Sequence, residues 1–161
     1  MEIERKFLVD KDSLPDISAL RTSTIIQGYI SKDPEIRIRQ KVEENSSSYF
    51  LTIKSTGDLE REEFEIEITR DLFERLFTNI ISELIHKDRY YMEIMNEDKY
   101  KSNTKLTIEI DIFKGKYSDL ITAEVEFDNR KDADTFIPLN WFGKEITYEK
   151  TYKNKYLAFD K

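Results

Sequence analysis

The sequence predicts an α+β protein built around an antiparallel β-barrel of about eight strands, a tunnel with a polar, charged lumen flanked by a few helices. Ionisable and apolar residues alternate in segments that recur along the chain, beginning with Met1-Glu2-Ile3-Glu4-Arg5-Lys6. Short turn signals separate these segments, and strands joined by short loops pair antiparallel. About eight strands are enough to close into a barrel, which turns the charged face inward.

The strands are expected wherever this alternation occurs. Side chains two residues apart in a strand project from the same face, so one face collects the ionisable residues and the other the apolar ones. The expected strands cover residues 1–9, 23–31, 34–42, 48–56, 61–69, 86–95, 104–113 and 121–128, with a further short one at 144–149.

Three segments are predicted to be helical. Apolar residues recur at helical spacing over 71–84, where Thr69 or Asp71 would cap the helix start. This helix is expected to bury part of the apolar face of the sheet. A shorter helix is expected at 130–136, and one or two helical turns at 152–159. The chain has no repeat or linker, so we expect a single domain over residues 1–161.

Composition limits the function classes. A chain of 161 residues, 39% hydrophobic and 37% charged, is long enough to bury a core and carries an excess of charge. The net charge of −7 argues against a basic surface for nucleic acid. No cysteine is present, which excludes thiolate metal sites. Without a signal-like start or an apolar run of transmembrane length, a cytoplasmic enzyme or binding protein with no membrane partner is expected.

Phosphate binding, if it occurs, must use side chains. The four glycines form no glycine-rich phosphate loop. The alternating segments instead concentrate Lys and Arg together with Glu. A local basic lining inside an acidic protein suits a small, multiply charged anion accompanied by a metal ion.

A set of short motifs occurs in order from residue 1 to about 158. They are Glu2-x-Glu4-x-Lys6, Gln27-Gly28-Tyr29, Arg37-x-Arg39, Thr52-Ile53-Lys54, Arg61-x-Glu63-Phe64-Glu65, Lys87-x-Arg89-Tyr90, Asp111-Ile112-Phe113, Glu124-x-Glu126 and Glu145-Ile146-Thr147. Together they resemble the CYTH superfamily, the triphosphate tunnel metalloenzymes, which are named for class IV adenylyl cyclase and thiamine triphosphatase. The resemblance implies an eight-stranded antiparallel tunnel that takes a triphosphate inside.

The resemblance also implies a role for each matching residue. The positions that match the family's phosphate-gripping cations are Lys6, Arg37, Arg39, Lys54, Arg61, Lys87 and Arg89. The positions that match its metal-holding acids are Glu2, Glu4 and Glu126, and the further acids Glu63, Glu65, Asp111 and Glu124 would hold a second metal or position the cations. The metal implied is Mg²⁺ or Mn²⁺, because a hard dication prefers carboxylate oxygens and bridges to phosphate.

Some of these residues have a second interpretation. The Arg and Lys residues could be cross-strand salt-bridge partners of the acids, and Glu35 could pair with Arg37 or Arg39. Glu109 is an equally good member of a structural ion pair. Tyr29 either lines the tunnel or belongs to the core.

The C-terminal motif departs from the family pattern. Tyr152-Lys153-Asn154 follows Thr151, whereas many family members carry a basic residue at that position. Lys150 or Lys153 would have to replace that residue.

The leading hypothesis is a metal-dependent triphosphatase that removes a terminal phosphoryl group from a small triphosphate. Inorganic tripolyphosphate is the preferred substrate, because the chain has no recognisable nucleoside-specific feature. Glu4 would help to hold the metal and Arg61 would help to fix the phosphate chain in line. Lys87 is a candidate general base if Arg89 lowers its pKa.

Other functions share the same motifs. In an adenylyl cyclase the ribose 3′-hydroxyl of ATP would attack the α-phosphate, and a thiamine triphosphatase would use the same tunnel. A non-catalytic sensor of polyphosphate or nucleotide triphosphate would not need metal-ligand carboxylates. The resemblance is also compatible with a homodimer.

Overall fold

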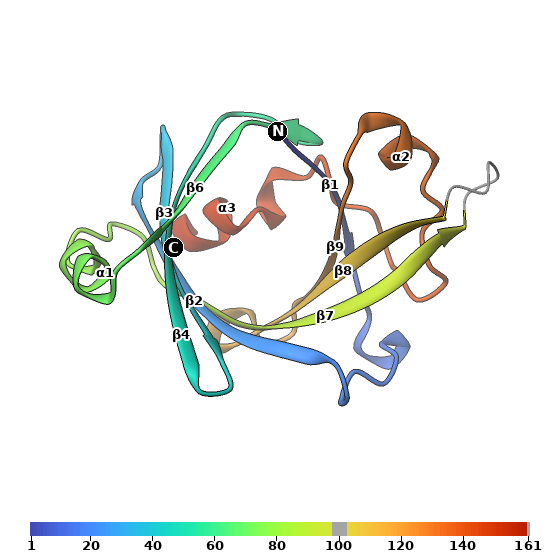
Figure 1. Ribbon diagram of the computed structural model, residues 1–161, viewed down its shortest axis with the longest axis horizontal. Helices are drawn as coiled ribbons and strands as arrows, with labels where there is room; N and C mark the ends of the chain where they lie inside the picture. Colours follow the sequence, from blue (N-terminus) through green and yellow to red (C-terminus); the bar gives the residue numbers. More distant parts are fainter. Residues whose placement is uncertain (98–102, 161) are drawn as a thin grey trace.

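A computed structural model of the protein describes residues 1–97 and 103–160 (Figure 1). One antiparallel sheet has the strand order β5-β1-β9-β8-β7-β2-β3-β4-β6. Its strands are β1 (Glu2–Leu8), β2 (Arg21–Ser31), β3 (Glu35–Glu43), β4 (Ser46–Lys54), β5 (Glu60–Arg61), β6 (Glu63–Ile68), β7 (Ile85–Glu97), β8 (Asn103–Phe113) and β9 (Ile121–Glu126). The predicted α+β class and antiparallel barrel are therefore confirmed.

The barrel is nearly closed, because the two ends of the sheet are consecutive in the chain. β5 pairs with β1, β6 pairs with β4, and only Glu62 separates β5 from β6. At Glu62 the backbone turns toward Ser55, whose N–H donates to the Glu62 carbonyl at 2.9 Å. The segment predicted as one strand at 61–69 is thus two strands, and the sheet has nine strands rather than eight.

Residues 144–149 do not form the strand that was expected there. Their only β-pairing in the described part of the chain is an isolated bridge between Phe7 and Glu145. The Ile146 N–H donates to the Lys6 carbonyl at 2.8 Å, but the Lys6 N–H donates to the Thr147 hydroxyl at 3.0 Å. Because a side-chain oxygen replaces the backbone carbonyl here, the ladder stops after one bridge.

The first helix is shorter than the apolar spacing predicts, whereas the other two lie within the segments expected for them. The helices are α1 (Arg70–Phe77), α2 (Arg130–Thr135) and α3 (Asn154–Phe159). Thr69 caps α1 by accepting a hydrogen bond from the Leu72 N–H, as predicted. The chain leaves the helix after Phe77 because the Ile81 N–H donates to the Tyr29 carbonyl instead. Ile81 and Leu84 are consequently 64% and 47% exposed, so the expectation that the apolar side of the 71–84 helix packs on the sheet was wrong for these two residues.

The outer face of the barrel is covered unevenly. One core cluster joins β1, β8 and β9 to α2 and includes Phe7, Ile108 and Phe136. α1 covers β3 and β4 through Phe73, which packs on Tyr49. It does not reach the middle of β6, where Phe64 and Ile66 are 64% and 60% exposed, so the expected helical cover is missing there.

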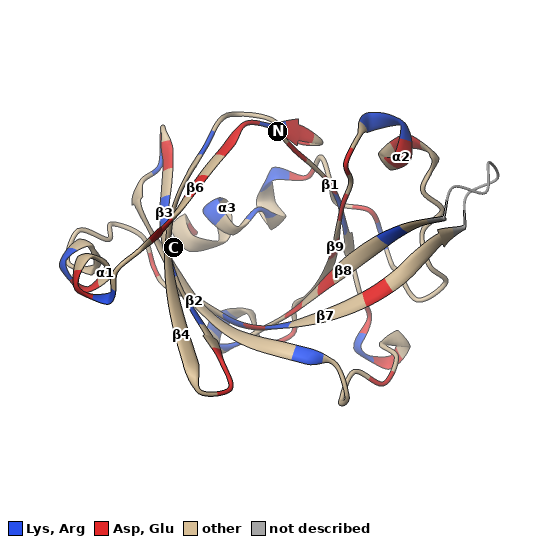
Figure 2. Cartoon of the chain, in the orientation of Figure 1, with Lys and Arg blue, Asp and Glu red and all other residues tan. Residues whose placement is uncertain are grey.

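Charged residues of both signs occur around the whole ring (Figure 2). One end of the ring is filled by α3. Leu157 and Ala158 of α3 pack against Tyr29, Ile85 and Phe113 from three neighbouring strands. Three-residue 3₁₀ turns lie at Lys11–Ser13, Gly115–Tyr117 and Lys150–Tyr152. None of the helices in the described part of the chain is long and apolar enough to cross a membrane.

Candidate active site in the barrel lumen

The barrel encloses a polar cavity of about 200 Å³. Strand alternation turns the ionisable side chains of β1, β3, β4, β6, β7 and β9 toward it, as the sequence predicts. The predicted cations that line it are Lys6, Arg37, Arg39, Lys54, Arg61 and Arg89. The predicted acids that line it are Glu2, Glu4, Glu63, Glu65, Glu124 and Glu126. The structure thus brings twelve of the fourteen proposed site residues together.

The other two, Lys87 and Asp111, lie behind the lining. Both side chains are completely buried, and their Nζ and Oδ2 atoms are 2.7 Å apart. Asp111 also accepts two hydrogen bonds from the guanidinium of Arg89, at 2.7 and 2.8 Å. Asp111 is therefore occupied by two cations, one of which, Arg89, reaches the cavity.

This buried network shifts both pKa values. Burial lowers the pKa of Lys87 to about 7, although Asp111 acts in the opposite direction. Burial alone would raise the pKa of Asp111, but Arg89 and Lys87 hold it at about 2. The Lys87 ammonium also donates to the Asn154 side chain at 3.2 Å, which ties the network to the start of α3.

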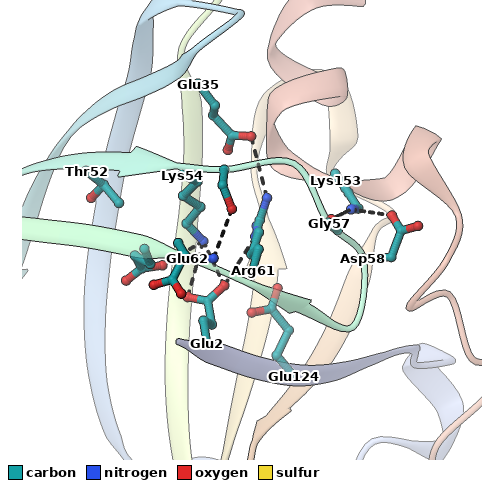
Figure 3. A network of polar contacts seen from close by, with 12 residues as sticks. Glu2, Glu35, Thr52, Lys54, Gly57, Asp58, Arg61, Glu62, Glu124 and Lys153 are labelled. Atoms are coloured by element: carbon teal, nitrogen blue, oxygen red, sulfur yellow. Dashed lines mark hydrogen bonds and ion pairs between the residues drawn. The ribbon is translucent and has the colours of Figure 1, made fainter.

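The lining cations are paired with acids from neighbouring strands. Glu2 lies between Lys54, at 3.1 Å, and Arg61, at 3.4 Å (Figure 3). Lys54 also contacts Glu63 at 3.0 Å, and Lys6 contacts Glu124 at 3.1 Å in the same way. The cross-strand salt bridges considered above therefore do occur. They reduce the repulsion between the like charges in the lumen.

Glu35 and Glu109 complete the ring of pairs. Glu35 contacts Arg61 at 3.5 Å and Lys155 at 3.7 Å. The expectation that Glu35 pairs with Arg37 or Arg39 was therefore wrong. Glu109 lines the cavity and contacts Arg89 at 2.6 Å, so it belongs to an ion pair and to the lining at once.

The arginines on β3 form a crowded positive wall. Arg37 donates to Thr52 at 3.2 Å and lies 3.7 Å from Glu65. Burial, followed by the nearby guanidiniums of Arg37 and Arg89, lowers the pKa of Arg39 to about 10. Arg39 remains protonated at neutral pH, so this wall concentrates positive charge that an anion would relieve.

Glu4 and Glu126 form a negatively charged site in the same cavity. They face each other on β1 and β9, and neither forms a salt bridge with the described residues. Burial, then Glu124 and Glu2, raises the pKa of Glu4 to about 8. Burial, then Glu2 and Glu109, also raises the pKa of Glu126. These carboxyls are therefore short of positive charge.

The chemistry of these acids fits a hard divalent cation. Within residues 1–97 and 103–160, no three Asp, Glu or His side chains form a ready-made metal cage. Mg²⁺ does not need one, because it keeps several waters and is usually held by one or two carboxylates plus substrate phosphates. Glu4 and Glu126 are such a pair, and Glu2 lies close enough to raise the pKa of both.

The C-terminal segment contributes lining residues that strand alternation does not reveal. Lys153, Asn154 and Lys155 all line the cavity, whereas Lys150 does not. The Lys153 ammonium donates to the Gly57 carbonyl and to Asp58, both at 2.6 Å (Figure 3). The motif around residue 152 was the only sequence signal for them.

The pKa of Glu4 predicts how the metal-free protein responds to pH. Between its ordinary value of 4.5 and about 8, the folded protein holds a proton that the unfolded chain releases, so stability falls as pH rises. From pH 5 to 7 we expect a loss of about 1–3 kcal/mol in the free energy of unfolding. Above pH 7 the titration of Lys87 acts in the opposite direction.

Urea unfolding in EDTA at pH 5, 6 and 7 measures this slope. Glu4→Gln, which cannot titrate, should flatten it. A wild-type stability that rises over the same interval would contradict the assignment.

A nearly closed antiparallel barrel with a charged lumen is the architecture expected of the triphosphate tunnel enzymes. Comparison of the chain with known protein families gives the same assignment. The chain belongs to the CYTH domain family, whose model matches residues 1–155. Triphosphate tunnel enzymes of this family depend in general on a divalent metal ion. The resemblance inferred from the motifs is thereby confirmed.

Individual relatives are similar over nearly the full length. The chain is 38% identical to the inorganic triphosphatase of Nitrosomonas europaea. The alignment extends over 157 residues and covers 98% of this chain and 96% of that protein. The crystal structure of the inorganic triphosphatase NE1496 has a TM-score of 0.67 and 36% identity, covering 100% of this chain and 96% of that one. The PH1819 protein of Pyrococcus horikoshii, 19% identical with a TM-score of 0.59 over 82% of this chain and 81% of that one, shares the fold.

Proposed function

We propose that this protein hydrolyses inorganic tripolyphosphate in the barrel lumen, with Mg²⁺ or Mn²⁺ as the metal. The observation that carries the proposal is the lining of the cavity. Of its residues in the described part of the chain, only Tyr29 and Ile146 present large apolar or aromatic groups. Such a cavity matches a substrate that consists of charged oxygens alone, and the similarity to a named inorganic triphosphatase supports it.

The cations of the lining grip the phosphates. Arg37, Arg39 and Arg61 can each present paired N–H donors to phosphate oxygens, whereas Lys54 acts as a point charge. The salt bridge to Glu2 holds the Lys54 ammonium in the lumen before substrate binds. The role proposed for these residues is therefore to fix the phosphate chain and to neutralise its charge.

The acids divide into two groups. Glu4 and Glu126, with Glu2, would hold the metal, which when bound supplies charge neutralisation and helps to activate water. The remaining acids keep cations in place: Glu63 holds Lys54, Glu65 holds Arg37, and Glu124 holds Lys6.

The buried residues would act through the lining. Asp111 orients Arg89, and Lys87 adds positive charge behind it. For Lys87 we favour this supporting role over that of a general base, because its side chain is completely buried and its ammonium is ion-paired with Asp111 and hydrogen-bonded to Asn154.

A nucleoside triphosphate is the second candidate substrate. A neighbouring cavity of about 350 Å³ shares Lys54 and Arg61 with the lumen and adds Pro34 and Tyr156. A base could stack on Tyr156 while the triphosphate occupies the lumen. Adenylyl cyclase activity would need this arrangement.

A product assay separates these functions. Phosphorus NMR should show tripolyphosphate converted to pyrophosphate and orthophosphate with Mg²⁺ or Mn²⁺, with a kcat/KM at least about tenfold above those for ATP and thiamine triphosphate. Glu4→Gln, purified identically, controls for contaminating phosphatase. Cyclic AMP as the main product from ATP would overturn the proposal. Tight binding of tripolyphosphate without turnover would favour a sensor.

A cytoplasmic location, a homodimer and a single domain over residues 1–161 stay predictions.

A further inference from the structure

The neighbouring cavity of about 350 Å³, which we call the vestibule, adjoins the lumen. Six residues line both spaces and therefore mark the junction between them: Glu35, Lys54, Asp58, Arg61, Lys153 and Lys155. Pro34 and Tyr156 line the vestibule but not the lumen. The surface that could hold a nucleobase thus lies beyond this junction.

A third cavity, of about 320 Å³, also adjoins the lumen and is acidic. Its acids are Glu4, Glu109, Glu124, Glu126 and Asp128. Among the described residues, Lys105 is the only cation in its lining. Such a surface repels a triphosphate, so the vestibule is the side of the lumen that suits an anionic substrate.

One salt bridge links two distant segments at the junction. The Lys153 ammonium donates to the Gly57 carbonyl and to Asp58, both at 2.6 Å (Figure 3). Asp58 lies between β4 and β5, and Lys153 lies 95 residues later, at the start of α3. Their side chains are 36% and 17% exposed, so water screens the bridge only in part.

Both ends of the bridge are anchored. The carbonyl of Leu59, next to Asp58, accepts a hydrogen bond from the Glu4 N–H at 3.1 Å, and the Leu59 side chain is buried in the core. The Lys153 carbonyl accepts from the N–H of the buried Leu157 at 3.0 Å. Moving either segment would disturb the core, so a ligand that crosses the junction has to break the side-chain bridge instead.

This bridge does not involve the residues assigned to the phosphates. A second contact at the junction does, because Glu35 lies 3.5 Å from Arg61. A phosphate can replace Glu35 as the partner of Arg61. When the Lys153 bridge opens, by contrast, no proposed phosphate position replaces Asp58.

A nucleoside would have to break the bridge without replacing it. With its phosphates in the lumen, a nucleoside triphosphate must pass its ribose through the junction to reach Tyr156. Ribose hydroxyls are neutral, so they do not compensate the separated Lys153 ammonium and Asp58 carboxylate. Inorganic tripolyphosphate stays in the lumen and leaves the bridge intact. An unpaired charge that arises with only one class of substrate produces specificity.

We propose that the salt bridge between Lys153 and Asp58 determines substrate specificity by closing the junction to the nucleoside part of nucleoside triphosphates. The inference rests on the proposed function and deepens it. Asp58 is a specificity-determining residue that does not contact the reacting phosphates.

The test uses Asp58→Ala, which removes the carboxylate from the bridge. We expect kcat/KM for ATP with Mg²⁺ to rise about tenfold, mainly through a lower KM, while the value for tripolyphosphate stays within about twofold. Asp33→Ala is the matched control, because Asp33 lines the vestibule 3.3 Å from Lys155 but does not line the lumen. It should leave both values unchanged.

Lys153→Met breaks the same bridge from the other side and decides the question if Asp58→Ala does not fold. Calorimetry in EDTA, where nothing is cleaved, should show the Kd for ATP falling about tenfold in each variant. An unchanged or weaker affinity and kcat/KM for ATP in the folded variants would overturn the inference. Failure of the wild type to bind or cleave tripolyphosphate would instead overturn the proposed function.

Discussion

Replacing Glu4 by glutamine should lower tripolyphosphate hydrolysis by about a hundredfold or more, because a metal ion contributes several kcal/mol of charge stabilisation in such reactions. Glutamine keeps the shape of Glu4 but removes the negative charge that a metal needs. The same change should make the metal-free protein more stable at pH 7, because Glu4 is held at a raised pKa among Glu124 and Glu2. Lower activity with higher stability is a signature that a folding defect cannot produce.

Phosphate release at saturating Mg²⁺ and Mn²⁺, with urea unfolding in EDTA, measures both effects. Glu67→Gln is the matched control, since Glu67 shares the inward face of β6 with Glu63 and Glu65 but is exposed and outside the cavity lining. It should keep wild-type activity. Full activity in Glu4→Gln would refute the metal role.

Asp111→Asn is expected to cost the most stability. Asp111 is completely buried and compensates both Lys87 and Arg89. An amide of the same size leaves Lys87 buried without its counter-charge and leaves Arg89 with Glu109 alone, and breaking such a network typically costs about 3–5 kcal/mol. For a chain of this length that corresponds to a fall of roughly 10 °C in melting temperature. Activity should fall as well, because Arg89 loses the group that orients it.

Denaturant unfolding of the wild type and the variant measures this loss. The control is Glu93→Gln on the neighbouring part of β7, where Glu93 and Lys105 form a salt bridge with side chains about two-thirds exposed. Removing an exposed pair of this kind should change stability by less than about 1 kcal/mol. Equal stability of Asp111→Asn and the wild type would contradict the buried network.

Alternation at period two was enough to predict the barrel and most of its lining. Arg37, Lys54 and Glu126 lie on different strands far apart in sequence, yet each follows the same alternation and faces the same cavity. The physical reason is that a closed sheet has only one inner face. The type of each side chain then determines the charge of the lumen.

Alternation says nothing about depth along the barrel. Lys87 and Arg89 share one face of β7, but only Arg89 lines the cavity, since Lys87 is completely buried against Asp111 and Asn154. That distinction depends on how α3 packs into one end of the ring. No local pattern in the sequence encodes such a long-range contact.

The errors in the predicted elements have the same origin. Apolar spacing predicts a helix over 71–84. The helix ends earlier because the Ile81 N–H donates to the Tyr29 carbonyl on β2 and not to a carbonyl of the helix. Alternation predicts one strand over 61–69, because the pattern continues through Glu62. The structure breaks this strand at Glu62, where the chain changes its pairing partner from β1 to β4. Both breaks follow from contacts between distant segments.

We expect the triphosphate to lie inside the barrel, between the cations and the carboxylates of the lining. A crystal structure with tripolyphosphate and Mn²⁺, in which anomalous scattering locates the metal, tests this expectation most directly. We expect phosphate oxygens on Arg37, Arg39 and Lys54, with Mn²⁺ coordinated by Glu4 and Glu126. Tripolyphosphate on the outer surface, with the lumen still closed by its own salt bridges, would contradict the account.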